Sequence, residues 1–233
     1  MTQVRNDAGR PWSGRDSGAD DAQERGGAGA RGGEPERPKG RGGIAFLREF
    51  LKAPVELGTC FTSSKALARA MVSGLGLETA QTVIELGPGT GAITEEVLRR
   101  IPKGCRFFAI ERNAGLVREL RRRWPDLSVH QDDARNLRAI CEREGVRPGE
   151  VDVVVNSLPF LLFPEELQDE ILRETAAVLR PGGRFTLITY RIEGLMPSVR
   201  KFRRLMERHF SDVRLRRRVL QNMPPASVYW CTR

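Results

Sequence analysis

The chain has 233 residues, of which 39% are hydrophobic and 30% charged, and its formal net charge is +9. No apolar run approaches the roughly 20 residues that a membrane-spanning helix needs, so the composition predicts a globular protein that does not cross a bilayer. Two histidines, and four scattered cysteines without a Cys-x-x-Cys pair, predict free thiols and no metal site. The N-terminus has no secretory apolar segment, so we expect a cytoplasmic chain, and the positive charge favours an anionic partner, either nucleic acid or a membrane.

Three regions differ in composition. Residues 1–43 hold 11 of the 24 glycines and few large apolar residues, which predicts a disordered Gly/Arg-rich tail. Residues 44–81 predict two helices, of which the first, over residues 44–52, is amphipathic, ends before Pro54 and is expected to contact a membrane. The cap and apolar stripe of the second helix are assigned to Thr62 or Ser63 and to Leu67, Met71 and Val72. Residues 82–233 form the main domain.

Strands and helices alternate from residue 82 onward. This alternation predicts an α/β fold with a mostly parallel, seven-stranded sheet, helices on both faces and a closing antiparallel pair. The predicted strands span residues 82–86, 106–110, 127–130, 151–155, 184–190, 213–219 and 227–231, and the predicted helices span residues 92–100, 114–123, 165–179 and 198–209.

A glycine-rich turn joins the first strand to the first helix. Gly87, Gly89 and Gly91 have the spacing Gly-x-Gly-x-Gly, which permits a tight turn and a close approach of ligand to backbone. The spacing differs from that of dinucleotide folds, and the Lys-Ser or Lys-Thr of a P-loop is absent. Glu85 precedes the glycines, and its carboxylate suits a cationic group better than a pyrophosphate.

Acidic residues also follow the next two strands. Glu111 ends the second strand, where a carboxylate can accept the hydroxyls of a ribose. Asp132-Asp133-Ala134 follows the third strand, where a side chain can bind an adenine amino group. Three such features at successive strand ends predict an adenosine site.

These motifs resemble those of the class I S-adenosylmethionine-dependent methyltransferases, over about residues 62–233. The resemblance implies a Rossmann-like fold, a methyltransferase domain over residues 82–233 and S-adenosyl-L-methionine as cofactor. Asp133 is preferred over Asp132 because Asp133-Ala134 matches the family's acidic-Ala step. The implied cofactor-binding residues are Glu85, Gly87, Gly89, Gly91, Glu111, Asp133 and Ala134.

Two families differ in the substrate that they imply. Residues 46–233 resemble the bacterial phospholipid N-methyltransferases, through a Leu-Pro-rich stretch over residues 157–164 and Asn-Met-Pro-Pro-Ala-Ser-Val-Tyr over residues 222–229. This implies N-methylation of phosphatidylethanolamine toward phosphatidylcholine, at the inner face of the membrane. The alternative is RNA methylation, because Phe61-Thr62 is similar to an element of the ribosomal RNA adenine dimethylases. Their fourth-strand Asn-x-Pro motif is out of register here, since Asn156 lies one residue too early.

Charge and aromatic residues supply the remaining hypotheses. Residues 198–218 hold nine Arg or Lys against two acidic residues, with Phe202, Leu205, Met206 and Phe210 among them, which predicts a basic amphipathic helix for an anionic membrane surface. The same charges suit RNA phosphates. The candidate catalytic residues are Tyr190, Ser157 and Tyr229, and the candidates for binding a lipid phosphate are Arg191 and Arg200.

Overall fold

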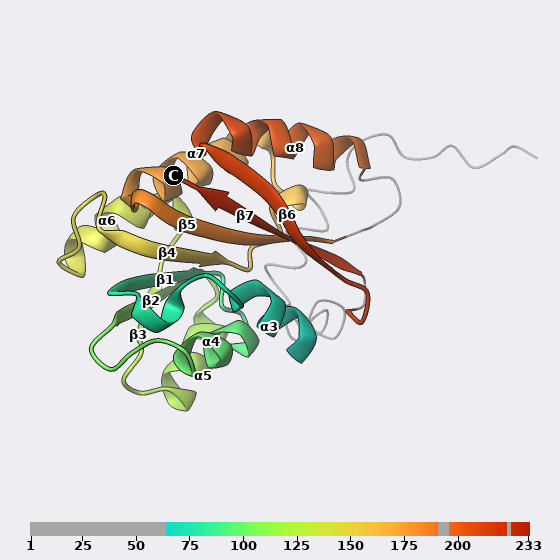
Figure 1. Cartoon of the computed structure of the whole chain (residues 1–233). Helices are drawn as coiled ribbons and strands as arrows, with labels where there is room; N and C mark the ends of the chain where they lie inside the picture. Colours follow the sequence, from blue (N-terminus) through green and yellow to red (C-terminus); the bar gives the residue numbers. More distant parts are fainter. Residues whose placement is uncertain (1–63, 191–195, 223–224) are drawn as a thin grey trace, which may run out of the picture. The chain divides into compact units, whose positions relative to one another are not determined.

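The computed structural model describes residues 64–190, 196–222 and 225–233. Seven strands in these ranges form one sheet in the order β3-β2-β1-β4-β5-β7-β6. β1 to β5 run parallel, and β7 lies antiparallel between β5 and β6. The predicted mostly parallel sheet with an antiparallel C-terminal pair is confirmed (Figure 1). The strands are β1 Thr82–Leu86, β2 Arg106–Glu111, β3 Ser128–Gln131, β4 Val151–Asn156, β5 Leu179–Tyr190, β6 Asp212–Val219 and β7 Ala226–Thr232.

Helices cover both faces of this sheet. α3, α4 and α5 lie on one face and α6, α7 and α8 on the other (Figure 1). The helices are α3 Lys65–Val72, α4 Ala92–Leu98, α5 Ala114–Arg123, α6 Leu137–Arg143, α7 Glu165–Val178 and α8 Met196–His209, with short 3₁₀ turns η1 Leu77–Thr79, η2 Ala134–Asn136 and η3 Phe160–Leu162.

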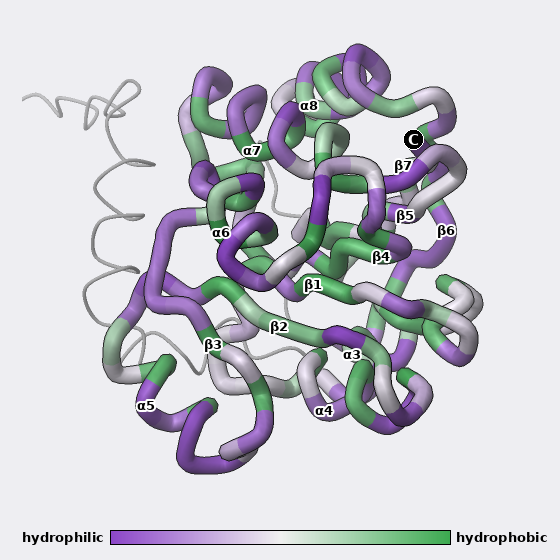
Figure 2. The backbone as a smooth tube through the Cα atoms, turned by 90° about the vertical axis from the view of Figure 1, so that its left-hand side faces the viewer, coloured by the Kyte–Doolittle hydropathy of each residue, from purple (hydrophilic) through white to green (hydrophobic). Residues whose placement is uncertain are grey.

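The central strands are apolar on both sides because helices cover both sides. Every residue of β1 is buried, and β1, β2 and β4 are largely green in Figure 2. Alternate residues of β1 enter opposite cores: Ile84 packs with α6, α7 and α8, and Val83 packs with α3, α4 and α5. Such two-sided burial is typical of parallel sheets.

The N-terminal end of α3 differs from the prediction. Its cap is Ser64, whose hydroxyl accepts a hydrogen bond from the Leu67 backbone N–H at 3.2 Å. The predicted apolar stripe is confirmed, because Leu67, Met71 and Val72 are all buried. The predicted tail, the helix over residues 44–52, Thr62, Ser63, Cys60 and Arg191 lie outside the described residues.

The structure adds one helix that the sequence analysis missed and lengthens one strand. α6 buries Leu137, Ile140 and Cys141, three residues at helical spacing in a short segment that also holds Arg138, Glu142 and Arg143. β5 begins at Leu179 rather than at the predicted residue 184, with a shift in its register against β4 between Val151 and Val153.

The apolar residues of α8 are part of the core. Phe202, Leu205, Met206 and Phe210 are buried against the sheet and α7, so the prediction that they face a membrane is wrong. The helix is amphipathic because it packs on a sheet, and only its charged face is exposed. Within the described part of the chain, no helix is both long and apolar enough to span a membrane.

Candidate active site

The turn between β1 and α4 carries three glycines with positive φ. The values are +68° at Gly87, +58° at Gly89 and +84° at Gly91, a backbone region that L side chains rarely adopt. A Cβ on Gly91 would collide with the ring of Trp124, whereas a Cβ on Gly89 would meet no atom within 4 Å. Gly91 is therefore required for packing, and Gly89 borders open space from which a ligand can approach the backbone.

Glu111, at the end of β2, is turned toward this glycine turn. Its Oε2 accepts a hydrogen bond from the Gly89 N–H at 3.2 Å, and its Oε1 accepts one from the Asn113 N–H at 2.8 Å. Burial raises the pKa of Glu111, although these backbone hydrogen bonds oppose the rise. Each carboxylate oxygen keeps further acceptor capacity, so the group can also bind the hydroxyls of a sugar.

Glu85 lies beneath the turn and is fully buried. Its Oε2 accepts a hydrogen bond from the Thr94 hydroxyl of α4 at 2.7 Å, and its Oε1 has no hydrogen-bond partner in the part of the chain that the structure describes. Burial raises the pKa of Glu85 to about 8, the Thr94 hydrogen bond opposes the rise, and the charge of Glu111 adds to it. A buried carboxylate with an unpartnered oxygen favours a cationic ligand, which would stabilise the ionised form.

The two aspartates after β3 already have cationic neighbours. Asp133 caps η2 and accepts hydrogen bonds from the backbone and side chain of Arg135, at 3.0 and 3.1 Å. Partial burial raises the pKa of Asp133, but the Arg135 hydrogen bonds lower it by more, so the net shift is downward. Asp132 binds Asn136 and Arg143 at 2.7 and 2.6 Å, which lowers its pKa. The preference for Asp133 over Asp132 stays a prediction, as does the role of the buried Ala134 beside it.

The end of β4 provides two buried polar atoms without partners. Within the described residues, Asn156 Oδ1 and Ser157 Oγ make no hydrogen bond, and the Asn156 amide donates to the Leu158 carbonyl at 3.4 Å. Asn156 stands beside Leu86 in the parallel register of β1 and β4, next to the glycine turn. A Cβ on Gly87 would lie 2.5 Å from the Leu158 side chain, so this turn and the segment after β4 are in close contact.

The aliphatic composition of the segment after β4, residues 158–163, would suit acyl chains or a membrane-facing mouth. Phe160 is instead fully buried, and it packs against Phe202 of α8 with ring centres 5.2 Å apart. Leu158, Leu161 and Phe163 are half-buried against the same core. This segment is therefore largely a structural layer, and only the partly exposed side chains remain available to a substrate.

The two candidate tyrosines lie on opposite faces of the sheet. Tyr190 is the last residue of β5, half-buried on the α3 face, at the same edge of the sheet as the glycine turn. Tyr229 pairs with Leu187, which is level with Asn156 and Leu86 at the ends of β4 and β1, but it is buried on the α8 face. Because Tyr190 is partly exposed and Tyr229 is buried, accessibility favours Tyr190 over Tyr229 for contact with a substrate.

Comparisons with known proteins agree with this geometry. Residues 83–183 match the model of a family described as a methyltransferase domain. The chain is 35% identical over 191 residues to a Singulisphaera acidiphila protein named ornithine lipid N-methyltransferase. This alignment covers 80% of this chain and 93% of that protein. The chain belongs to the class I S-adenosylmethionine-dependent methyltransferases.

Two further relatives broaden the comparison. The chain is 38% identical over 130 residues to ribosomal RNA small subunit methyltransferase A of Acidobacterium capsulatum. This alignment covers 54% of this chain and 43% of that protein. The structure of the Burkholderia thailandensis 1,6-didemethyltoxoflavin-N1-methyltransferase, with S-adenosylhomocysteine bound, superposes with a TM-score of 0.57 at 16% identity. That alignment covers 82% of this chain and 86% of the other, and it shows a shared fold.

S-adenosylmethionine is accordingly the cofactor of this methyltransferase, and the residues at the strand ends fit it. The unpartnered Oε1 of Glu85 suits the cationic methionyl end, and the open side of Gly89 allows the ligand to approach the backbone. Glu111 is oriented by Gly89 and Asn113 at the position expected for a ribose-binding carboxylate. These assignments to individual residues remain predictions.

Sequence reasoning missed two residues of this site. Thr94 is the hydrogen-bond partner of Glu85, and only the packing of α4 against β1 brings them together. Asn156 was considered only as an out-of-register RNA-binding residue, yet it is buried with an unpartnered oxygen. A polar residue that directly follows three consecutive valines, Val153 to Val155, was the available signal.

Proposed function

We propose that this methyltransferase N-methylates the primary amine of a membrane lipid headgroup, working at the inner face of an anionic membrane. Phosphatidylethanolamine is the substrate that the sequence motifs predict, and ornithine lipid is the one in the name of the relative with 35% identity. Both lipids carry a primary amine on a molecule with fatty acyl chains, so the same reaction, N-methylation of that amine, applies to either lipid. The lipid relative is matched over 93% of its length and the RNA relative over only 43%, which favours lipid over RNA.

The observation that carries the proposal is the pair of unpartnered oxygens, Asn156 Oδ1 and Ser157 Oγ, at the end of β4. Buried polar atoms normally have partners, so acceptors without one favour a ligand that donates hydrogen bonds, as an amine does. Both groups are neutral. They can accept hydrogen bonds from the amine N–H groups without stabilising the ammonium form as strongly as a carboxylate would. The amine therefore loses its proton more easily than it would beside a carboxylate.

The protein's share of the chemistry is mainly alignment. S-adenosylmethionine supplies an activated methyl group on a positively charged sulfur. The amine must be neutral to attack, so its proton passes to solvent or, in phosphatidylethanolamine, to the lipid's own phosphate. Asn156 and Ser157 would orient the remaining N–H bonds, and the ring of Tyr190 would bind the methylated, cationic product. Holding both reactants in line accounts for most of the acceleration expected of such a site.

The test is methyl transfer from labelled cofactor to three substrates in parallel. These are vesicles of phosphatidylethanolamine with an anionic lipid, vesicles of ornithine lipid with the same anionic lipid, and ribosomal RNA. We expect label in one or both lipids, and the two lipid arms identify the headgroup. Label that enters RNA alone would refute the proposal and establish the alternative.

Variants at β4 test the role of the two oxygens. Asn156→Ala and Ser157→Ala should each lower kcat by about tenfold or more while the affinity for the cofactor, measured by calorimetry, is unchanged. Ser211→Ala is the matched control, because Ser211 is exposed and its hydroxyl bonds only the Thr232 carbonyl, outside the site. Equal kcat in Ser157→Ala, Asn156→Ala and Ser211→Ala would contradict the assignment.

A further inference from the structure

The turn that joins β6 to β7 lies at the same edge of the sheet as the active site. Val219 and Tyr190 both pair with Ala226, the first residue of β7, so the end of β6 is level with the end of β5. β5 runs parallel to β4, and β4 runs parallel to β1, whose end carries the glycine turn. The β6–β7 turn therefore stands beside the edge where methyl transfer takes place.

This turn exposes the most accessible large apolar side chain of the described residues. Leu220, directly after β6, is 71% exposed, and Leu215 in the middle of β6 follows at 37%. No other large hydrophobic residue in the described ranges is classed as exposed. Single exposed apolar side chains are common on protein surfaces, so Leu220 is informative only together with its position at this edge and its charged neighbours.

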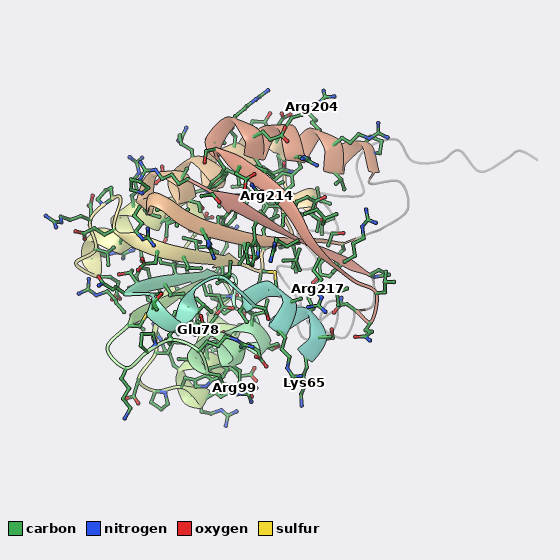
Figure 3. All side chains as sticks on the ribbon, in the orientation of Figure 1. Lys65, Glu78, Arg99, Arg204, Arg214 and Arg217 are labelled. Carbon is green, nitrogen blue, oxygen red and sulfur yellow. The ribbon has the colours of Figure 1, made fainter. Side chains whose placement is uncertain are left out.

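Cationic side chains flank Leu220 on the edge strand. Arg217 and Arg218 are exposed and, among the described residues, form no ion pair, whereas Arg214 pairs with Asp212 at 2.7 Å. Figure 3 labels Arg214 and Arg217 on β6. A bulge between Leu215 and Arg217 interrupts the pairing with β7. Unpaired arginines next to an exposed aliphatic residue match the composition of a peptide that lies in the headgroup layer of an anionic membrane.

The described part of this turn, residues 220–222, is tied to the rest of the domain. Asn222 is buried, and its side-chain oxygen accepts a hydrogen bond from the Ser64 backbone N–H at 3.0 Å, which ties the turn to the start of α3. On β7, Trp230 is covered by the guanidinium of Arg216, 4.2 Å from the ring centre. An anchored turn loses little conformational entropy when it binds a surface, and this favours docking.

We infer that the end of β6, from Arg217 to Leu220, is the element that docks the enzyme on an anionic lipid leaflet, with Leu220 inserted among the headgroups and Arg217 and Arg218 bound to their phosphates. This inference rests on the proposed lipid N-methyltransferase function and adds the orientation of the enzyme. The edge that carries Tyr190 and the glycine turn then faces the membrane. The exposed residue is aliphatic, whereas single-stranded RNA is bound by aromatic residues that stack on its bases, so the turn suits lipid better than RNA.

The first test measures binding of the full-length protein to sedimented vesicles of phosphatidylethanolamine and phosphatidylglycerol. Leu220→Ser should weaken binding roughly tenfold, and Arg217→Gln with Arg218→Gln should weaken it by a similar factor that shrinks in high salt. Leu215→Ser is the matched leucine control. Arg122→Gln on α5 is the arginine control, since Arg122 is exposed and α5 packs beside β3 at the other end of the sheet.

A second test separates this inference from the proposed function. Methyl transfer is measured with the lipid in detergent micelles and in vesicles, and we expect Leu220→Ser to lose activity only on vesicles. If the wild-type protein methylates no lipid in either form, the proposed function fails. If it methylates lipid but Leu220→Ser binds vesicles as well as the wild type does, the docking inference alone is overturned. It is equally overturned if the arginine variants lose binding to RNA and keep binding to vesicles.

Discussion

The stability of Glu85→Gln relative to the wild type should rise as the pH is raised from acidic to neutral. Burial raises the pKa of Glu85 to about 8 from an ordinary value of 4.5. The folded protein therefore keeps this proton over a pH range in which the unfolded chain has lost it. Because the unfolded state then binds fewer protons, stability falls as pH rises from about 4.5 to about 8.

The size of the effect follows from this pKa. The slope approaches about 1.4 kcal/mol for each pH unit, which amounts to roughly 2–3 kcal/mol between about pH 5.5 and about pH 7.5. Glutamine does not titrate, so the difference in the free energy of unfolding between the variant and the wild type should change by this amount over that range. For a chain of this size, about 2–3 kcal/mol corresponds to a change of roughly 5–10 °C in Tm. Unpaired N–H groups of the new amide would add a cost that does not depend on pH.

The assay is thermal and urea denaturation of the cofactor-free protein across this pH range. Glu78→Gln is the control, because Glu78 is an exposed carboxylate on η1 (Figure 3). The same Glu85→Gln variant should bind S-adenosylmethionine more weakly, and it should lose the gain in affinity with rising pH that ionisation of Glu85 gives the wild type. A constant stability difference between variant and wild type at every pH would refute the reasoning about Glu85.

Three further predictions concern packing and the cofactor. Gly91→Ala should lower the free energy of unfolding by roughly 2–5 kcal/mol, because it adds a collision with Trp124 to the left-handed backbone strain. Gly89→Ala should lower it by only about 1–2 kcal/mol. Urea denaturation compares the two variants, and equal losses would contradict the open space seen at Gly89. Phe202→Ala should destabilise the protein by about 3–5 kcal/mol in the same assay, and a loss below about 0.5 kcal/mol would mean that the apolar face of α8 is not core. Glu111→Ala should weaken cofactor binding at least about tenfold by calorimetry, and unchanged affinity would remove Glu111 from the site.

Much of the fold was predictable because its signals are local. Strands buried on both faces are continuous apolar runs, and their alternation with amphipathic helices indicates a parallel sheet without any knowledge of contacts. The glycine turn and Glu111 were predictable for the same reason, since each immediately follows or ends a strand, and the ends of parallel strands meet at one edge. α6 was missed because its three buried residues occupy a short, highly charged segment.

The sequence by itself therefore determined the α/β fold, the glycine turn and the carboxylates at the strand ends. Only the tertiary structure decided what covers each apolar face. An amphipathic pattern states that a helix has an apolar side but not whether a sheet or a membrane covers it, and for α8 the answer is the sheet. The same limit applies to Glu85 with Thr94, to the unpartnered oxygen of Asn156 and to the exposed Leu220, because burial and hydrogen bonding depend on residues that are distant in the chain and adjacent only after folding.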